Sequence, residues 1–263
     1  MNRKRWRNLR QRTIATVRTT TPSPTTLKKW LNQCLDQPCL VCGQPALEQP
    51  GLCADCEWTL PWQPPGCQCC AVSPEERPAT TWLCDACQLS PPHFRRCHCL
   101  FRYTSPVNAL ISRIKDNGGF AEARTLGELL AREFERHYQD SGQSLPTLLV
   151  PVPLHSGRLR FRGYNQSHLL AQAISARTGI KVLHNSCRRQ PLTHSQRGLD
   201  ATSRRANMAQ MFTASARTRL TSNRQVAIID DVVTTTSTIR AMAQVLTHAG
   251  AETIDVWALA RAN

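Results

Sequence analysis

Long apolar runs, acidic residues near the N-terminus and aromatic residues are all scarce in this chain of 263 residues. No apolar run reaches the length of about 20 residues that a membrane-spanning helix needs, so we expect no membrane span. The first 33 residues contain no acid and no apolar core of the kind found in secretory signals, which argues against a secretory leader. Aromatic residues amount to 6%, so few side chains can stack on exposed bases.

The N-terminal head, residues 1–33, is strongly basic. Nine of its residues are Lys or Arg, in a chain whose formal net charge is +15. The Thr- and Pro-rich stretch 19–24 at its centre argues against continuous structure. We predict a disordered arm able to touch phosphate groups. An organelle transit peptide and a misassigned translation start are the alternatives.

Cysteine is abundant, and eight of the 13 cysteines form four Cys-x-x-Cys pairs. Two thiolates two residues apart fit one face of a tetrahedral ion, so two pairs complete a zinc site. Disulfides are the alternative, but cytosolic thiols are kept reduced. We therefore predict about two structural Zn²⁺ ions. The predicted ligands are Cys39, Cys42, Cys53 and Cys56 in the first site, and Cys67, Cys70, Cys84 and Cys87 in the second.

Other cysteines lie close to these pairs. Cys69 adjoins Cys70 and could replace it as a ligand. Cys97, His98 and Cys99 form a further compact cluster, which we interpret as a half-buried strand leading into Phe101. The cysteine-rich region is also rich in Pro and could not bury enough apolar surface alone, so we expect its fold to depend on metal.

The segment 226–238 combines an apolar strand, two acids and a hydroxyl-rich loop. The β-branched run 226–229 is typical of a buried strand, and helical spacing of apolar residues resumes at Ile239. Backbone N–H groups at a helix start, with about half a positive charge from the helix dipole, attract phosphate. Carboxylates can accept hydrogen bonds from ribose hydroxyls or hold Mg²⁺. An ordinary strand–helix junction with capping hydroxyls is the alternative. The candidate site residues are Asp230, Asp231, Thr234, Thr235, Thr236, Ser237 and Thr238.

Strands alternate with helices throughout the C-terminal half. This alternation predicts an α/β fold with a doubly wound parallel sheet, whose ligands lie beyond the carboxyl ends of the strands. The predicted strands span 148–153, 181–183, 226–229 and 254–259, and the predicted helices span 165–178 and 236–248.

Two basic segments would reach the same crevice. Arg158, Arg160 and Arg162 surround a glycine turn between a strand and its helix, and guanidinium groups pair with phosphate oxygens. A solvated basic loop is the alternative. The second segment, 188–212, is polar and long enough to predict a lid or binding loop. Its candidate residues for contacting DNA or closing over the site are Arg188, Arg189 and Arg204.

The acidic strand end and its loop resemble the 5-phosphoribosyl 1-pyrophosphate (PRPP) binding motif of type I phosphoribosyltransferases. The resemblance implies that the candidate residues, together with Arg158 and Arg162, bind PRPP or another ribose phosphate with Mg²⁺. Thr236 stands where that family usually has Gly. If the position needs positive φ, a β-branched residue there costs about 1–3 kcal/mol.

Cysteine pairs followed by such a domain resemble the ComF family of competence-associated proteins and their DNA-utilisation relatives. The resemblance covers roughly residues 38–261 and leaves the basic head at 1–33 outside it. It implies a double zinc-binding module at 34–100 and a phosphoribosyltransferase-like domain at 101–263. It also implies a cytoplasmic protein that handles single-stranded DNA in natural transformation or nutrient use, with competence or DNA-processing proteins as partners. The matching residues are 101–103, 111–115, 152–154, Arg158, 162–166, Thr193, Gln196, Leu199, Arg204, Asn207 and Phe212.

Three functions follow from these patterns. The preferred one is binding of PRPP and single-stranded DNA without turnover, because no residue identifies an acceptor and none is assigned a catalytic role. The alternative is an active phosphoribosyltransferase that acts on an unidentified base or amine. A zinc-ribbon transcription regulator is disfavoured, because the cysteine pairs lack a helix with readable base contacts.

Overall fold

The computed structural model describes residues 38–46, 51–74, 82–116, 118–184, 187–189, 212–214 and 224–262. The predictions for the basic head 1–33 and for the residues from Thr193 to Asn207 lie outside this part of the chain. None of the described helices combines the length and apolar character that crossing a membrane requires.

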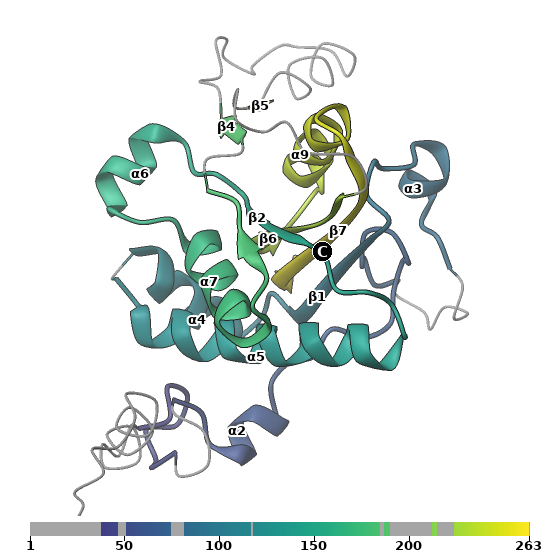
Figure 1. Cartoon of the computed structure of the whole chain (residues 1–263). Helices are drawn as coiled ribbons and strands as arrows, with labels where there is room; N and C mark the ends of the chain where they lie inside the picture. The colour runs from purple at the N-terminus through teal and green to yellow at the C-terminus, as the bar shows by residue number, and fades with distance from the viewer. Residues whose placement is uncertain are drawn as a thin grey trace, which may run out of the picture.

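A five-stranded parallel sheet forms the centre of the fold (Figure 1). Its order is β1-β7-β6-β2-β3, and every neighbouring pair is parallel. The predicted α/β parallel sheet is therefore confirmed. The edge strand β1 contains Cys97, His98 and Cys99, as the strand interpretation of that cluster expects. The strands are β1 (Arg96–Arg102), β2 (Leu148–Pro151), β3 (Lys181–Val182), β6 (Arg224–Val233) and β7 (Ala251–Arg261).

Helices cover both faces of the sheet (Figure 1). Successive side chains of a strand point to opposite faces. Ala227 and Ile229 of β6 therefore pack in one core with α4, α5 and α7, whereas Val226 and Ile228 pack in a second core with α9. The helices are α4 (Val107–Asp116), α5 (Phe120–Asp140), α6 (Ser156–Arg162), α7 (Gln166–Thr178) and α9 (Ser237–His248).

Among the described helices of the sheet domain, α5 and α6 were not expected from the sequence patterns. The longest helix, α5, has 21 residues and buries an apolar stripe that includes Leu126, Leu130 and Phe134. The segment 155–166, expected to be a loop, contains α6. His155 caps this helix by accepting a hydrogen bond from Gly157 N at 3.2 Å, and Gly163 ends it with a φ of 81°. These local signals favour one short helix between the arginines and the next element.

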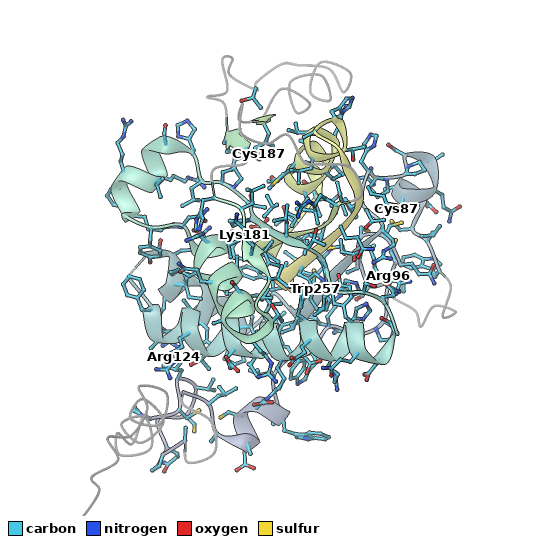
Figure 2. All side chains as sticks on the ribbon, viewed as in Figure 1. Cys87, Arg96, Arg124, Lys181, Cys187 and Trp257 are labelled. Carbon is cyan, nitrogen blue, oxygen red and sulfur yellow. The ribbon has the colours of Figure 1, made fainter. Side chains whose placement is uncertain are left out.

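The two cysteine-rich segments pack against different parts of the sheet domain (Figure 2). The first, which includes α2 (Ala54–Trp58), contributes Leu52 and Leu60 to the core formed by α4 and α5. Gly51 lies so close to α5 that a Cβ atom there would be 2.2 Å from Thr125 Oγ1. The second segment, which includes α3 (Asp85–Leu89), lies beside α9, and Cys87 is labelled there in Figure 2.

Candidate functional site

The acidic pair lies where β6 extends past the end of β2. The last residue of β2, Pro151, pairs with Ile229, and the following residues of β6 are paired on this side with no strand of the sheet. On the other side β6 stays paired with β7 as far as Val233. Asp230 and Asp231 therefore stand at the carboxyl edge of the sheet, where parallel α/β folds bind ligands.

Asp230 is buried with only 8% of its surface exposed. Its Oδ1 atom accepts hydrogen bonds from Ser167 Oγ at 3.1 Å and from Asp231 N at 2.9 Å. Burial, and then the negative charge of Asp231, raise the pKa of Asp230 well above the usual value of an aspartate. The folded protein therefore favours the protonated form of this side chain.

Asp231 faces a cation from another element. Lys115 Nζ, at the end of α4, lies 2.8 Å from Asp231 Oδ2. This oxygen is buried, and apart from the ion pair with Lys115 it accepts no hydrogen bond within the described part of the chain. Asp231 Oδ1 accepts a hydrogen bond from Val232 N at 2.9 Å. One carboxylate oxygen is thus fixed by the backbone, and the other is paired with Lys115.

The hydroxyl-rich loop joins β6 to α9. Thr236 occupies the N-cap position of α9 with φ 62° and ψ −3°, the left-handed conformation that the family glycine would adopt easily. Its side chain makes no cap hydrogen bond with the helix; instead, Thr236 Oγ1 accepts one from Arg240 Nε at 3.0 Å. Thr234 and Thr235 are exposed, and Thr235 Oγ1 lies 2.8 Å from Ser237 Oγ.

Two other segments contribute the predicted arginines. Arg162 donates to Gln166 Oε1 at 2.8 Å and lies 3.9 Å from Asp116, the neighbour of Lys115. Arg189 lies in the short ribbon of β4 (Cys187–Arg189) and β5 (Phe212–Ala214). Burial, and then the positive charge of Arg158, lower the pKa of Arg189, while Asp230 raises it.

Arg189 and Arg158 thus share one electrostatic neighbourhood with Asp230. Of the other predicted lid residues, Arg188 has a described backbone only, and Arg204 lies outside the described residues.

The eight predicted metal ligands come together in two groups of four. Within each group the sulfur atoms lie within 4.8 Å of one another. A tetrahedral ion with Zn–S bonds of about 2.3 Å separates its sulfurs by about 3.8 Å. The measured separations are 3.7 Å between Cys42 and Cys53 and 3.6 Å between Cys70 and Cys84, too long for disulfides. In the second group the structure brings in Cys70 rather than Cys69.

One thiol in each group is prepared for ionisation. Burial raises the pKa of Cys67, but the backbone N–H groups of Cys84, Cys70 and Cys69 outweigh it and bring the pKa to about 7. In the same way burial of Cys39 is outweighed by backbone hydrogen bonds, which bring its pKa to about 6. Thiolates are the form that binds metal, so both groups fit a Zn²⁺ ion.

Four residues of the site were missed at the level of sequence. Lys115 appeared only as part of a family pattern, and Ser167 was not singled out. Arg240 and Arg261, which hold the loop from the side of the cysteines, have no local signal because their partners are distant in the chain. Apart from the family pattern, the sequence signal for Lys115 is its place in the last turn of an amphipathic helix.

The fold and the site define a class: a type I phosphoribosyltransferase-like parallel sheet with an N-terminal module of two four-cysteine groups. A scan against protein-family models gives no match. The chain is 35% identical over 228 residues to competence protein F of Haemophilus influenzae, covering 85% of this chain and 96% of that protein. It is 32% identical to the DNA utilization protein YhgH of Salmonella typhimurium, again covering 85% and 96%. The chain therefore belongs to the family of competence protein F, the ComF family.

Two further similarities are more distant. Competence protein ComFC of Streptococcus pneumoniae is 22% identical over 240 residues, covering 85% of this chain and 99% of that protein. Among solved structures, a hypoxanthine phosphoribosyl transferase of Trypanosoma cruzi superposes with a TM-score of 0.37 and 17% identity, covering 54% of this chain and 66% of the other. A structural likeness of this size supports no conclusion by itself.

The raised pKa of Asp230 predicts a pH-dependent stability. Because the folded-state pKa lies above the unfolded one, stability from the protonated carboxyl is present at low pH and is lost as pH rises through the folded pKa. Asp230→Asn keeps an uncharged side chain of the same shape. Its melting temperature should exceed that of the wild type at neutral pH, and the difference should shrink toward about pH 4.

Thermal unfolding between pH 4 and pH 8 measures this difference. Asp140→Asn, at an exposed position at the end of α5, is the matched control and should show no such trend. A lower melting temperature for Asp230→Asn than for the wild type at neutral pH would contradict the raised pKa of Asp230 in the folded protein.

Proposed function

We propose that this protein binds PRPP or a related ribose phosphate at the carboxyl edge of its sheet, and handles single-stranded DNA in transformation or nutrient use. The observation that carries the proposal is the convergence of two acids, a hydroxyl-rich helix start and basic side chains at the end of β6. Acids suit ribose hydroxyls, and the helix start suits a phosphate.

The ribose end of the ligand is assigned to Asp230 and Asp231. Among the described residues, Asp231 Oδ2 is buried with Lys115 as its charge partner and accepts no other interaction that an additional donor would have to displace. A ribose hydroxyl could donate to this oxygen, or Mg²⁺ could bind it with the pyrophosphate of PRPP. When bound, Mg²⁺ would neutralise part of the pyrophosphate charge. Lys115 then serves to hold the carboxylate in place while the site is empty of ligand.

The phosphate end of the ligand is assigned to the loop from Thr234 to Thr238. The first N–H groups of α9 are not capped by the side chain of Thr236 and carry the positive end of the helix dipole. The hydroxyls of Thr235 and Ser237, 2.8 Å apart, can reorient to donate to phosphate oxygens. Arg158, Arg162 and Arg189 would add positive charge to the same site.

Binding without turnover is the preferred function. Among the described residues around the acids, none identifies an acceptor base or a catalytic group. The intact acid pair and its lysine favour, as the second candidate, an active phosphoribosyltransferase on an unidentified base or amine. Product analysis after incubation with PRPP and candidate acceptors distinguishes the two.

A role with DNA rests on the relatives and on charge. The relatives are named for competence and for DNA utilization, and this chain has a formal net charge of +15. Arg158 and Arg160 are exposed on α6. We propose that this surface contacts the phosphates of single-stranded DNA in the cytoplasm, alongside competence or DNA-processing proteins.

Zinc is proposed as the occupant of both cysteine groups. We expect elemental analysis of protein purified under reducing conditions to find about two Zn²⁺ per chain. A strong chelator should unfold the cysteine-rich segments, because structural zinc contributes about 10–16 kcal/mol in finger peptides. Cys69→Ser should keep the full zinc content, since Cys69 lies outside the group of four, whereas Cys84→Ser should lose one ion. Protein that folds with no bound zinc would refute the proposal.

Asp231→Ala should weaken PRPP binding about ten- to hundredfold, the loss expected for a hydrogen bond or metal contact to a charged group. Calorimetry with PRPP and Mg²⁺ measures the affinity. The control is Asp255→Ala on β7, which removes a buried acid that pairs with Arg95 at 2.5 Å, away from the crevice. It should lower the melting temperature but leave affinity unchanged. Equal affinity in the wild type and Asp231→Ala would remove the site assignment.

Binding of single-stranded DNA should weaken with salt, with a log–log slope of about −0.7 for each phosphate neutralised. Arg158→Gln should reduce the magnitude of the slope by about 0.7. Arg124→Gln is the matched control, because Arg124 is an exposed arginine of α5 beside the first cysteine segment (Figure 2). Deleting residues 1–33 should flatten the slope without abolishing binding. Loss of all binding in that deletion would assign DNA contact to the head alone.

A further inference from the structure

The second cysteine group and the loop at the start of α9 are joined by a single guanidinium. Arg240, in the first turn of α9, donates from Nε to Thr236 Oγ1 at 3.0 Å and from Nη1 to Ser90 O at 2.7 Å. Its third nitrogen, Nη2, lies 3.5 Å from Cys87 Sγ. One rigid, planar side chain thus touches a sulfur of the metal-binding group and a residue of the loop.

A second arginine holds the other end of the loop. Arg261, at the end of β7, is buried with 6% of its surface exposed. Its Nε donates to Cys70 O at 3.0 Å, and its Nη1 donates to Val233 O at 3.1 Å and to Thr234 O. The backbone at the exit of β6 is therefore fastened to the backbone beside a cysteine of the group.

Thr236 explains why the loop needs this support. A β-branched residue with φ 62° is in a strained conformation, and such a conformation persists only where its surroundings enforce it. The hydroxyl of Thr236 accepts from Arg240, a contact that glycine could not make. The departure from the family glycine thus adds a connection between the loop and the cysteine group.

The first cysteine group has a different set of contacts and serves as an internal comparison. Arg113 of α4 donates to Leu40 O at 3.0 Å, and Arg132 of α5 pairs with Glu57. Leu52 and Leu60 pack in the core with the same two helices. The contacts of this group therefore lead to α4 and α5, whereas those of the second group lead to the loop.

We infer that the second cysteine group sets the conformation of the loop through the positioning residues Arg240 and Arg261, so that metal in this group is required for tight phosphate binding. A metal-bound thiolate accepts hydrogen bonds from a cation more strongly than a neutral thiol, and such outer contacts orient the groups that make them. Loss of the metal frees Arg240, and with it Thr236 and the first N–H groups of α9. The inference rests on the proposed phosphate-binding function of this loop.

The test compares the two cysteine groups in the full chain. Cys84→Ser and Cys56→Ser each remove one ligand, from the second and the first group respectively. Zinc content, calorimetric affinity for PRPP with Mg²⁺, and amide hydrogen exchange of residues 233–238 are measured on each. Cys84→Ser should weaken PRPP binding about two- to thirtyfold and speed exchange in the loop, and Cys56→Ser should do neither. Equal effects of the two variants, or no effect of Cys84→Ser, would overturn the inference.

Variants that keep the metal test the contacts of Arg240 separately from metal binding. Arg240→Met keeps a long side chain without donors and should retain both zinc ions, yet bind PRPP as weakly as Cys84→Ser. The double variant should bind no more weakly than either single one. Thr236→Val removes only the accepting hydroxyl and should also weaken binding. Additive losses in the double variant would show that Arg240 does not carry the effect.

Failure of the proposed function gives a separate result. If the wild type binds neither PRPP nor ribose 5-phosphate, the phosphate-binding function is wrong. Amide hydrogen exchange in residues 233–238 then still tests whether the second cysteine group is coupled to the loop. Faster exchange in Cys84→Ser and Arg240→Met, with Cys56→Ser unchanged, would support the coupling alone, and unchanged exchange in all three would refute it.

Discussion

The difference in length between β6 and its neighbour β2 creates the site. β6 has ten residues and β2 has four, and their pairing stops at Ile229. β7 continues beside β6, so the extension stays ordered while its other side is left open. Two acids on a free chain would swing into water. On a strand held from one side only, they are fixed in direction while the other side of the strand stays unpaired with the sheet.

Two adjacent acids at a buried position repel each other, and the structure compensates with groups from distant elements. Asn165 donates to Val152 O at 2.9 Å and caps α7, which places Ser167 within 3.1 Å of Asp230. Tyr164 donates to Ile114 O and so ties the same segment to the end of α4, where Lys115 meets Asp231. The motif residues before α7 therefore act on the acids indirectly, by positioning the groups that touch them.

The sequence predicts the parts of this arrangement that depend on local pattern. β-branched runs locate the central strands, and the spacing of cysteine pairs identifies both groups of four, because each signal lies within a few residues. The family resemblance marks position 236 as one where a glycine is usual, but only the structure shows that its φ is positive. Contacts such as Lys115 with Asp231 cannot be predicted in this way, since they join elements far apart in sequence. α5 has a regular apolar stripe and was overlooked, although periodicity alone should have identified it.

The two cysteine groups show how the same local motif can take different roles through its surroundings. Both bring four sulfurs within 4.8 Å of one another. The first presents Leu52 and Leu60 to the core beside α4 and α5, in addition to its contacts with Arg113 and Arg132, so part of its contact is apolar and depends on buried area. The second meets the sheet domain through guanidinium groups, whose hydrogen bonds depend on direction and on the charge of their acceptors. An apolar contact changes little when the charge of a group changes. A directional hydrogen bond to a sulfur becomes stronger or weaker when the charge of that sulfur changes. In this chain the side chain beside the sulfur of Cys87 is Arg240, which also contacts Thr236 in the loop at the start of α9.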